Sequence, residues 1–242
     1  MHHVVLERWS RGDSLLHRRD PRAKIVALLA FLLVVATTPP GAALYMPAYA
    51  ALPVCALLMA RLPLGSALLK AAVVLPFCAV FAMISVAAGD FARAAALVEK
   101  SYLSALAVLA VAGATPVPRI ISGLASLGAP RFLLLVIQFL HRYLFVISEQ
   151  AQHMRLAAAS RGAGGGFRFR RWQLRAATGA LTVLFARSYL RAEGTYRSML
   201  SRSFEGHIHL LPTPTYVGGD VLLMVLGVLA PLMLRVTVEL LI

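Results

Sequence analysis

The sequence has few acidic residues and long stretches without any charge. Its 242 residues include 24 lysines and arginines but only 10 aspartates and glutamates, and 14% of the chain is charged. No formal charge occurs between Ile25 and Ala60. The hydrophobic fraction is 60%, which exceeds the roughly 45–50% of soluble domains. The net charge of +14 therefore does not indicate a soluble nucleic-acid-binding protein, and we predict an all-α, polytopic membrane protein.

The sequence also lacks the groups that most enzymes need. Its two cysteines, Cys55 and Cys78, lie in apolar runs, so we interpret them as small buried hydrophobes. No Gly-Lys-Ser follows the glycines at 162–166, which excludes a phosphate-binding loop there. The spans contain no nucleophile–base set and no carboxylate pair. The histidine pairs 2–3 and 207/209 have no third ligand at a recognisable spacing. We expect no catalytic residue, metal or cofactor on this chain.

Five stretches have the composition of membrane spans, since a helix needs about 20 apolar residues to cross the hydrocarbon core. Pro39-Pro40-Gly41 separates the first two as a helical hairpin. Pro76 falls within the third and predicts a kink. Residues 89–100 carry mixed charge and are predicted to be a connection. The expected spans are 22–38, 42–60, 66–88, 101–114 and 217–238.

Basic residues predict the orientation, because lysine and arginine concentrate on the cytoplasmic side of bacterial-type inner membranes. Thirteen of the 21 arginines lie between residues 115 and 216. With five spans, every basic connection is cytoplasmic if the N-terminus is inside, and the C-terminus is then external. We therefore divide the chain into a cytoplasmic head with four spans (1–114), a cytoplasmic segment (115–216) and a last span (217–242).

The basic segment is predicted to form three helices, two of them long. Prolines and glycines set their ends, which gives expected ranges of 117–127, 130–160 and 171–202. Each long helix ends in a short box that contains an arginine. The boxes are Ser160-Arg161-Gly162 and Ser201-Arg202-Ser203, the latter followed by Phe204-Glu205-Gly206.

These features, in this order, resemble the transmembrane (T) component of energy-coupling-factor transporters, in particular the cobalt-transport CbiQ-type permease subunit. The residues that carry the resemblance are spread over about 190 of the 242 positions. They are Ser14 to Lys24, Thr115-Pro116, Leu127 to Pro130, Arg142-Tyr143, Glu149, Ser160 to Gly162 and Met199 to Gly206.

The resemblance implies a mechanism. In that family the tips of two crossed coupling helices dock in grooves on a pair of cytoplasmic ABC-type ATPases, and the T component links ATP-driven closure to a substrate-binding membrane subunit. The implied docking arginines are Arg161 and Arg202, with Ser160, Gly162, Ser201 and Ser203 beside them. ATP and Mg would be bound by the ATPases. Cobalt or nickel is the implied substrate, and in such a complex another subunit selects it.

The chain departs from the family pattern in its two boxes. Both have serine where the family has alanine, and Ser203 stands where it has glycine. The alternative for each box is an ordinary helix stop, with the arginine interacting with the C-terminal dipole.

Two other functions are open. A solute carrier or channel would place ionisable groups within its spans, and spans one to four have almost none. A membrane enzyme acting on lipid-linked substrates would cluster acidic residues at one face. Residues 115–216 contain only three acidic side chains, at Glu149, Glu193 and Glu205.

Overall fold

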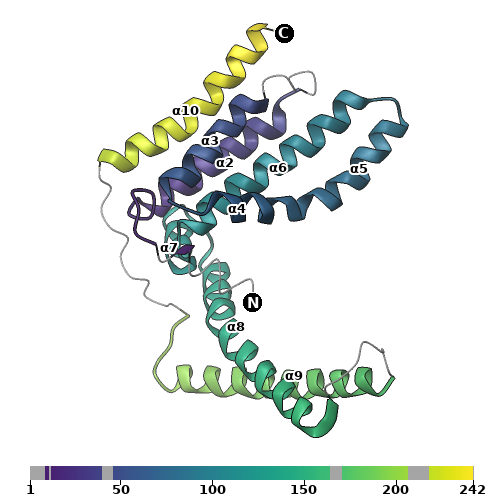
Figure 1. The fold of residues 1–242 in the computed structure, drawn as a ribbon. Coiled ribbons are helices and arrows are strands. Elements are labelled where there is room, and N and C mark those ends of the chain that lie inside the picture. Colours follow the sequence, from purple (N-terminus) through teal and green to yellow (C-terminus); the bar gives the residue numbers. More distant parts are fainter. Residues whose placement is uncertain (1–8, 11, 40–45, 164–170, 207–217, 242) are drawn as a thin grey trace. The chain divides into compact units, whose positions relative to one another are not determined.

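The structure is a computed structural model that describes residues 9–10, 12–39, 46–163, 171–206 and 218–241 (Figure 1). Every regular element in these ranges is helical, which confirms the predicted all-α class. Following the chain, the elements are α2 (Pro21–Thr37), α3 (Met46–Met59), α4 (Leu64–Ala71), η2 (Ala72–Val74), α5 (Leu75–Ala87), α6 (Phe91–Gly113), α7 (Val117–Ser126), α8 (Arg131–Ala158), η3 (Ala159–Ala163), α9 (Arg171–Leu200) and α10 (Gly218–Leu241).

The chain forms two compact units. One, called here the bundle unit, comprises residues 1–128 and 211–242 and contains α2–α7 and α10. The other, the two-helix unit, comprises residues 129–210 and contains α8 and α9. The three helices expected in the basic segment are confirmed as helices at Val117–Ser126, Arg131–Ala158 and Arg171–Leu200. α7 belongs by its contacts to the bundle unit, where it packs on α2.

Within the described residues, four helical stretches are long and apolar enough to cross a membrane: Leu64–Ala87, Phe91–Gly113, Arg131–Arg161 and Gly218–Leu240. The first and last match the predicted spans 66–88 and 217–238. The stretch within α8 was expected outside the membrane, yet its N-terminal half is rich in leucine, valine, isoleucine and phenylalanine. The first two predicted spans form shorter helices, of 17 residues in α2 and 14 in α3.

The prediction of a connection over residues 89–100 was wrong. α6 begins at Phe91, so the turn between α5 and α6 is only Ala88, Gly89 and Asp90. Gly89 has φ +82 and ends α5, a backbone conformation that glycine adopts without strain. The Asp90 side chain then accepts from the Arg93 N–H and caps α6. Such a cap satisfies a backbone donor that the first turn leaves unpaired.

The helix is interrupted just before Pro76, where a kink was predicted. Proline cannot donate to the carbonyl four residues earlier, which here is that of Ala72. The helix switches to a 3₁₀ turn at Ala72–Val74, directly before α5 begins. Of the two cysteines, Cys78 on α5 is buried as predicted, whereas Cys55 on α3 is exposed.

The bundle unit packs around small residues. α10 lies along α2, and a Cβ added at Gly227 would stand 2.5 Å from the Cβ of Ala27. Small residues at such crossings let membrane helices approach closely. The bundle unit also contains two clusters of buried side chains. One contains Leu57, Leu62 and Leu106; the other contains Phe31, Val35, Tyr49, Leu103 and Val238.

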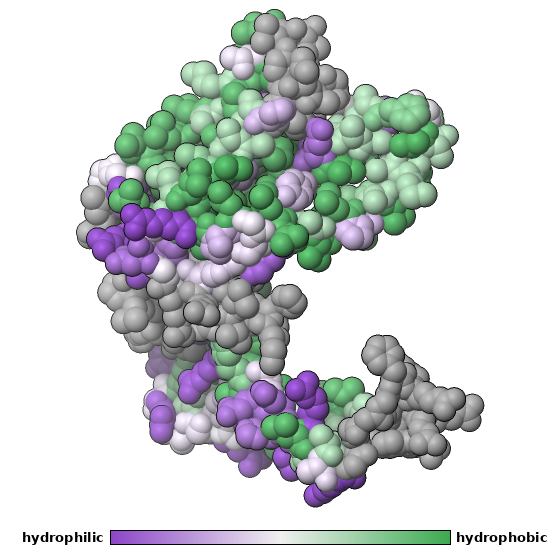
Figure 2. All heavy atoms as spheres, viewed as in Figure 1, coloured by the Kyte–Doolittle hydropathy of each residue, from purple (hydrophilic) through white to green (hydrophobic). Residues whose placement is uncertain are grey.

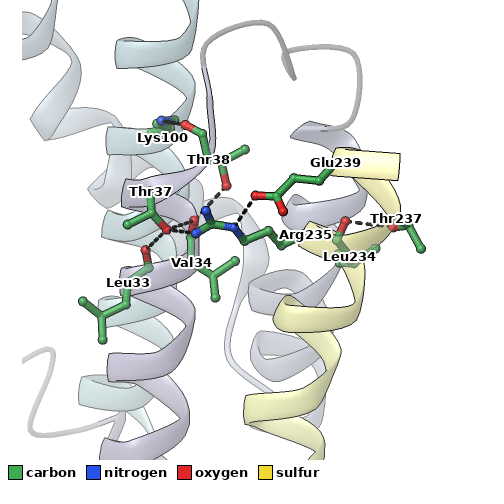
Figure 3. Close-up of polar contacts among 9 residues, drawn as sticks. All are labelled: Leu33, Val34, Thr37, Thr38, Lys100, Leu234, Arg235, Thr237 and Glu239. Atoms are coloured by element: carbon green, nitrogen blue, oxygen red, sulfur yellow. Dashed lines mark hydrogen bonds and ion pairs between the residues drawn. The ribbon is translucent and has the colours of Figure 1, made fainter. Parts of the chain in front are cut away.

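The C-terminal end of α2 is held by cations from α6 and α10 (Figure 3). Lys100 Nζ donates to the carbonyl of Thr38 at 2.5 Å, and the Thr38 hydroxyl donates to Val34 O at 2.7 Å. Arg235 on α10 donates to the Thr37 hydroxyl and also pairs with Glu239 at 2.9 Å. Cations near a helix C-terminus satisfy its last carbonyls and complement its dipole. These contacts fix where α2 ends.

Candidate partner-docking site

The first box lies at the C-terminal tip of α8. Ser160, Arg161 and Gly162 fall within a π turn, Ala159–Ala163, that follows α8 without a break. The Ser160 hydroxyl donates to Ala157 O at 2.9 Å, so it bonds to its own helix. Arg161 is exposed and has no ion-pair partner among the described residues. π turns are rare and occur often at functional sites. The tip therefore presents an unpaired guanidinium to solvent.

The second box ends α9 in a Schellman motif. The Ser203 N–H donates to Leu200 O and the Phe204 N–H donates to Met199 O, both at 3.0 Å. This pattern requires a left-handed residue where the helix stops, and Ser203 supplies it with φ +57. Serine therefore makes the stop for which the family pattern uses glycine. The geometry leaves Arg202, the residue before the stop, exposed.

The two-helix unit has almost no core of its own. Leu134 is its one buried side chain among those that the structure describes. Large apolar and aromatic side chains on both helices are exposed instead, at Phe132, Leu140, Leu156, Leu181, Phe185, Tyr189, Leu190, Tyr196 and Leu200. Figure 2 shows how hydrophobic and hydrophilic side chains alternate over the described surface of this unit. Exposed apolar surface of this extent is typical of protein or membrane contacts.

α8 and α9 contact each other where Tyr143 Oη lies 3.0 Å from Thr195 Oγ1. Figure 1 shows α8 crossing α9, with their C-terminal tips on opposite sides of the crossing. An open crevice of about 560 Å³ lies beside this contact, and Glu149, His153, Arg187 and Arg191 are among its lining residues. The two boxes are therefore the tips of different helices, exposed on opposite sides of the crossing (Figure 1).

The sequence motif from Ser14 to Lys24 forms a polar network in the bundle unit. His17 is buried; its Nδ1 lies 2.7 Å from Ser14 Oγ and its Nε2 2.9 Å from Trp9 O. Asp20, also buried, caps α2 by accepting from the Arg22 N–H at 2.8 Å.

Beside this network, exposed Arg18 donates two hydrogen bonds to Asp13, which lowers the pKa of the Asp13 carboxyl.

Sequence reasoning missed the partner of this motif on α10. Asp220 is only 5% exposed, and its Oδ1 accepts from the Asp20 N–H at 3.2 Å. Lys24 is 2% exposed and donates to Ala114 O at 3.2 Å and Thr115 Oγ1 at 3.1 Å. A charge at the start of an otherwise apolar span was the available signal, because buried charges require partners.

The described part of the chain contains no candidate metal site. No group of three or more His, Cys, Asp or Glu side chains is placed to hold an ion there. The histidine pairs 2–3 and 207/209, the glycines 164–166 and the aromatic–arginine run 167–170 lie outside the described residues.

Together these observations define a polytopic, all-helical membrane protein with a two-helix unit whose surface and tips are open to partners. The profile of the CbiQ family, described as cobalt transport protein, matches residues 12–212. This match covers most of the chain, so the protein belongs to the CbiQ cobalt transport family. No curated protein matches the sequence.

Proposed function

We propose that this chain is the transmembrane coupling subunit of an energy-coupling-factor importer. In this proposal the tips of α8 and α9 dock on two ABC-type ATPase subunits, and the bundle unit contacts a substrate-binding membrane subunit. ATP and Mg are bound by the ATPases, and this chain is not an enzyme. Cobalt or nickel ions are the transported substrates. The complex lies in a bacterial inner membrane, with the N-terminus cytoplasmic and the C-terminus external.

One observation carries the proposal: two long helices with almost no core each end in an exposed arginine. The guanidinium of arginine can form two parallel hydrogen bonds with a carboxylate, a geometry that lysine cannot reproduce. Small neighbours at Ser160, Gly162 and Ser201 allow a groove to close around each tip. Helix-in-groove docking is an established recognition mode. An ordinary helix stop requires neither the unpaired guanidinium nor the uncovered apolar faces.

The test is co-purification of the complex from membranes. We expect the double variant Arg161→Ala/Arg202→Ala to lose the ATPase subunits or to hydrolyse ATP without transport. Loss of one partner of a buried charged pair costs about 2–5 kcal/mol, which exceeds a tenfold loss of affinity for one tip. The single variants lose less, because the other tip remains docked.

A matched control is Arg155→Ala/Arg191→Ala, which removes two exposed arginines from the same helices and leaves both boxes intact. This control is expected to retain both ATPases. If the double tip variant retains the ATPases and ion uptake at equal expression, the two boxes are ordinary helix ends and the proposal is wrong.

A further inference from the structure

The chain passes between the bundle unit and the two-helix unit at two connections. Residues at the start of α2 contact the bundle-unit element next to each connection. The chain leaves the bundle unit after α7, and it re-enters the unit at residue 211, ahead of α10. In sequence, the contacted residues are about 90 and 200 residues from the start of α2. All the contacts described below lie within the bundle unit.

At the first connection, where the chain runs from α6 through α7 towards α8, Lys24 binds the junction between α6 and α7. Its Nζ donates to the carbonyl of Ala114 at 3.2 Å and to the hydroxyl of Thr115 at 3.1 Å. Both Lys24 and Thr115 are 2% exposed. A second bond joins α7 to the same region, because Arg119 Nη1 donates to His17 O at 3.2 Å.

At the second connection, which leads from α9 to α10, Asp220 joins the first turn of α10 to the start of α2. Its Oδ1 accepts from the backbone N–H of Asp20 at 3.2 Å and lies 3.7 Å from Arg19 Nη1. The approach is so close that a Cβ at Gly219 would collide with the Arg19 guanidinium. Asp220 thereby fixes both the position and the rotation of the α10 start relative to α2.

These contacts are more buried than the polar contacts at the C-terminal end of α2, where Lys100 and Arg235 are half-buried, and between the two ends of α2 the helices pack through apolar and small residues. Apolar helix faces can slide past each other by small shear displacements. A buried charged group cannot move away from its partners without being left unpaired, which is strongly unfavourable. Polar bonds of buried groups at the start of α2 therefore keep α2, the α6–α7 junction and the start of α10 together.

We propose that Lys24 and Asp220 are positioning residues that transmit movement of α8 and α9 into the bundle unit. Because α7 and the first turn of α10 are both fixed to the start of α2, a displacement at either connection moves α2 with it. The set Arg19, Asp20, Lys24, Thr115 and Asp220 is called here the root clamp. This inference rests on the proposed coupling function.

The experiment uses the full complex, reconstituted in proteoliposomes with its ATPase and substrate-binding subunits. Three quantities are measured for each variant: the ATPase subunits retained, the rate of ATP hydrolysis, and the uptake of Co²⁺. Lys24→Met keeps the length of the side chain but removes its charge and donors. Asp220→Asn keeps an oxygen that can accept from Asp20 N–H but removes the charge that pairs with Arg19. We expect both variants to retain the ATPases, while the Co²⁺ taken up per ATP hydrolysed falls at least fivefold.

The control is Arg235→Gln, which removes a charge that joins α10 to α2 at the opposite end of α2 (Figure 3). It is expected to keep the wild-type ratio of uptake to hydrolysis. A fold-level defect lowers assembly, hydrolysis and uptake together and leaves that ratio unchanged. If Lys24→Met fails to accumulate, Thr115→Val replaces it, because that variant removes only one acceptor from Lys24.

An unchanged ratio in Lys24→Met or its replacement and in Asp220→Asn, with the ATPases retained, would overturn the root clamp and leave the proposed function intact. An equal fall of the ratio in Arg235→Gln would also overturn it, since the effect would then belong to the whole bundle. If the wild-type chain binds no ATPase subunits, the proposed function itself fails.

Discussion

The backbone N–H of Phe204 donates a 3.0 Å hydrogen bond to the carbonyl of Met199 across the end of α9. This bond closes the Schellman motif in which Ser203 has φ +57. Left-handed backbone is unfavourable for a residue with a Cβ. The tip that carries Arg202 is therefore fully formed but contains one residue in an unfavourable conformation.

We predict that Ser203→Gly stabilises the end of α9. Glycine adopts positive φ without the steric cost that serine bears, which is on the order of 1 kcal/mol. Amide hydrogen exchange measured in the intact purified variant should slow about fivefold at positions 203 and 204, because a stabilisation of about 1 kcal/mol corresponds to that factor. The β-branched Ser203→Val should have the opposite effect. Faster exchange in the glycine variant would show that the serine side chain itself stabilises the turn.

Replacing both tip arginines by lysine, which keeps the positive charge but not the planar guanidinium, should preserve docking only in part. We predict that Arg161→Lys/Arg202→Lys retains more ATPase than the double alanine variant but less than the wild type. A lysine ammonium provides a point charge, whereas arginine binds a carboxylate through two parallel bonds. The measurement is ATPase retained after purification in increasing salt, where we expect the lysine variant to dissociate first. Equal salt resistance of the lysine variant and the wild type would show that charge alone is sufficient.

The orientation of the chain is open to direct measurement. We predict that the tip of α9 is cytoplasmic and the residues after α2 are external, from the distribution of arginines. The native Cys55 and Cys78 are first replaced by serine, and single cysteines are then introduced by Pro39→Cys and Ser203→Cys. A membrane-impermeant thiol reagent applied to intact cells should label position 39 and not position 203.

This labelling also decides whether α8 crosses the bilayer, since its composition allows it to do so. A third cysteine at an exposed position of the α8 N-terminus, Arg131→Cys, should be unlabelled if both ends of α8 are cytoplasmic. Labelling at 131 but not at 203 would show that α8 is a further span and that the five-span arrangement is wrong.

Close packing of α10 on α2 predicts a large effect of a single methyl group. Gly227→Ala would bring two Cβ atoms to 2.5 Å, and overpacking of this kind typically costs about 1–3 kcal/mol. Thermal unfolding in detergent should therefore begin at a lower temperature. Gly194→Ala on α9 is the control, because a Cβ there meets nothing within 4 Å and alanine favours the helix. Equal unfolding temperatures for the two variants would contradict the close contact.

The purified chain alone is predicted to neither bind ATP tightly nor hydrolyse it, because its sequence contains no phosphate-binding loop. Equilibrium binding of a fluorescent nucleotide and phosphate release are the measurements. The co-purified complex with its ATPases is the positive control. Robust hydrolysis by the single subunit, with contaminating ATPases excluded, would contradict this expectation.

The sequence by itself determined the class and most of the helix boundaries. Hydropathy predicted a polytopic helical membrane protein, and prolines and glycines predicted α7, α8 and α9 to within a few residues. These features are local: a cap, a stop or an apolar run acts through neighbours within about one helical turn. The one boundary missed, at Phe91, was also encoded locally by Gly89 and Asp90. Mixed charge over the following turns concealed it.

Only the tertiary structure decided which distant residues meet. Nothing near Lys24 indicates that its partners are Ala114 O and Thr115, and nothing near Asp20 indicates Asp220. These pairings depend on how α2, α6 and α10 pack, and the packing in turn depends on contacts such as Gly227 against Ala27. Helix periodicity sets what each segment can form, whereas long-range packing determines the partner of each buried charge.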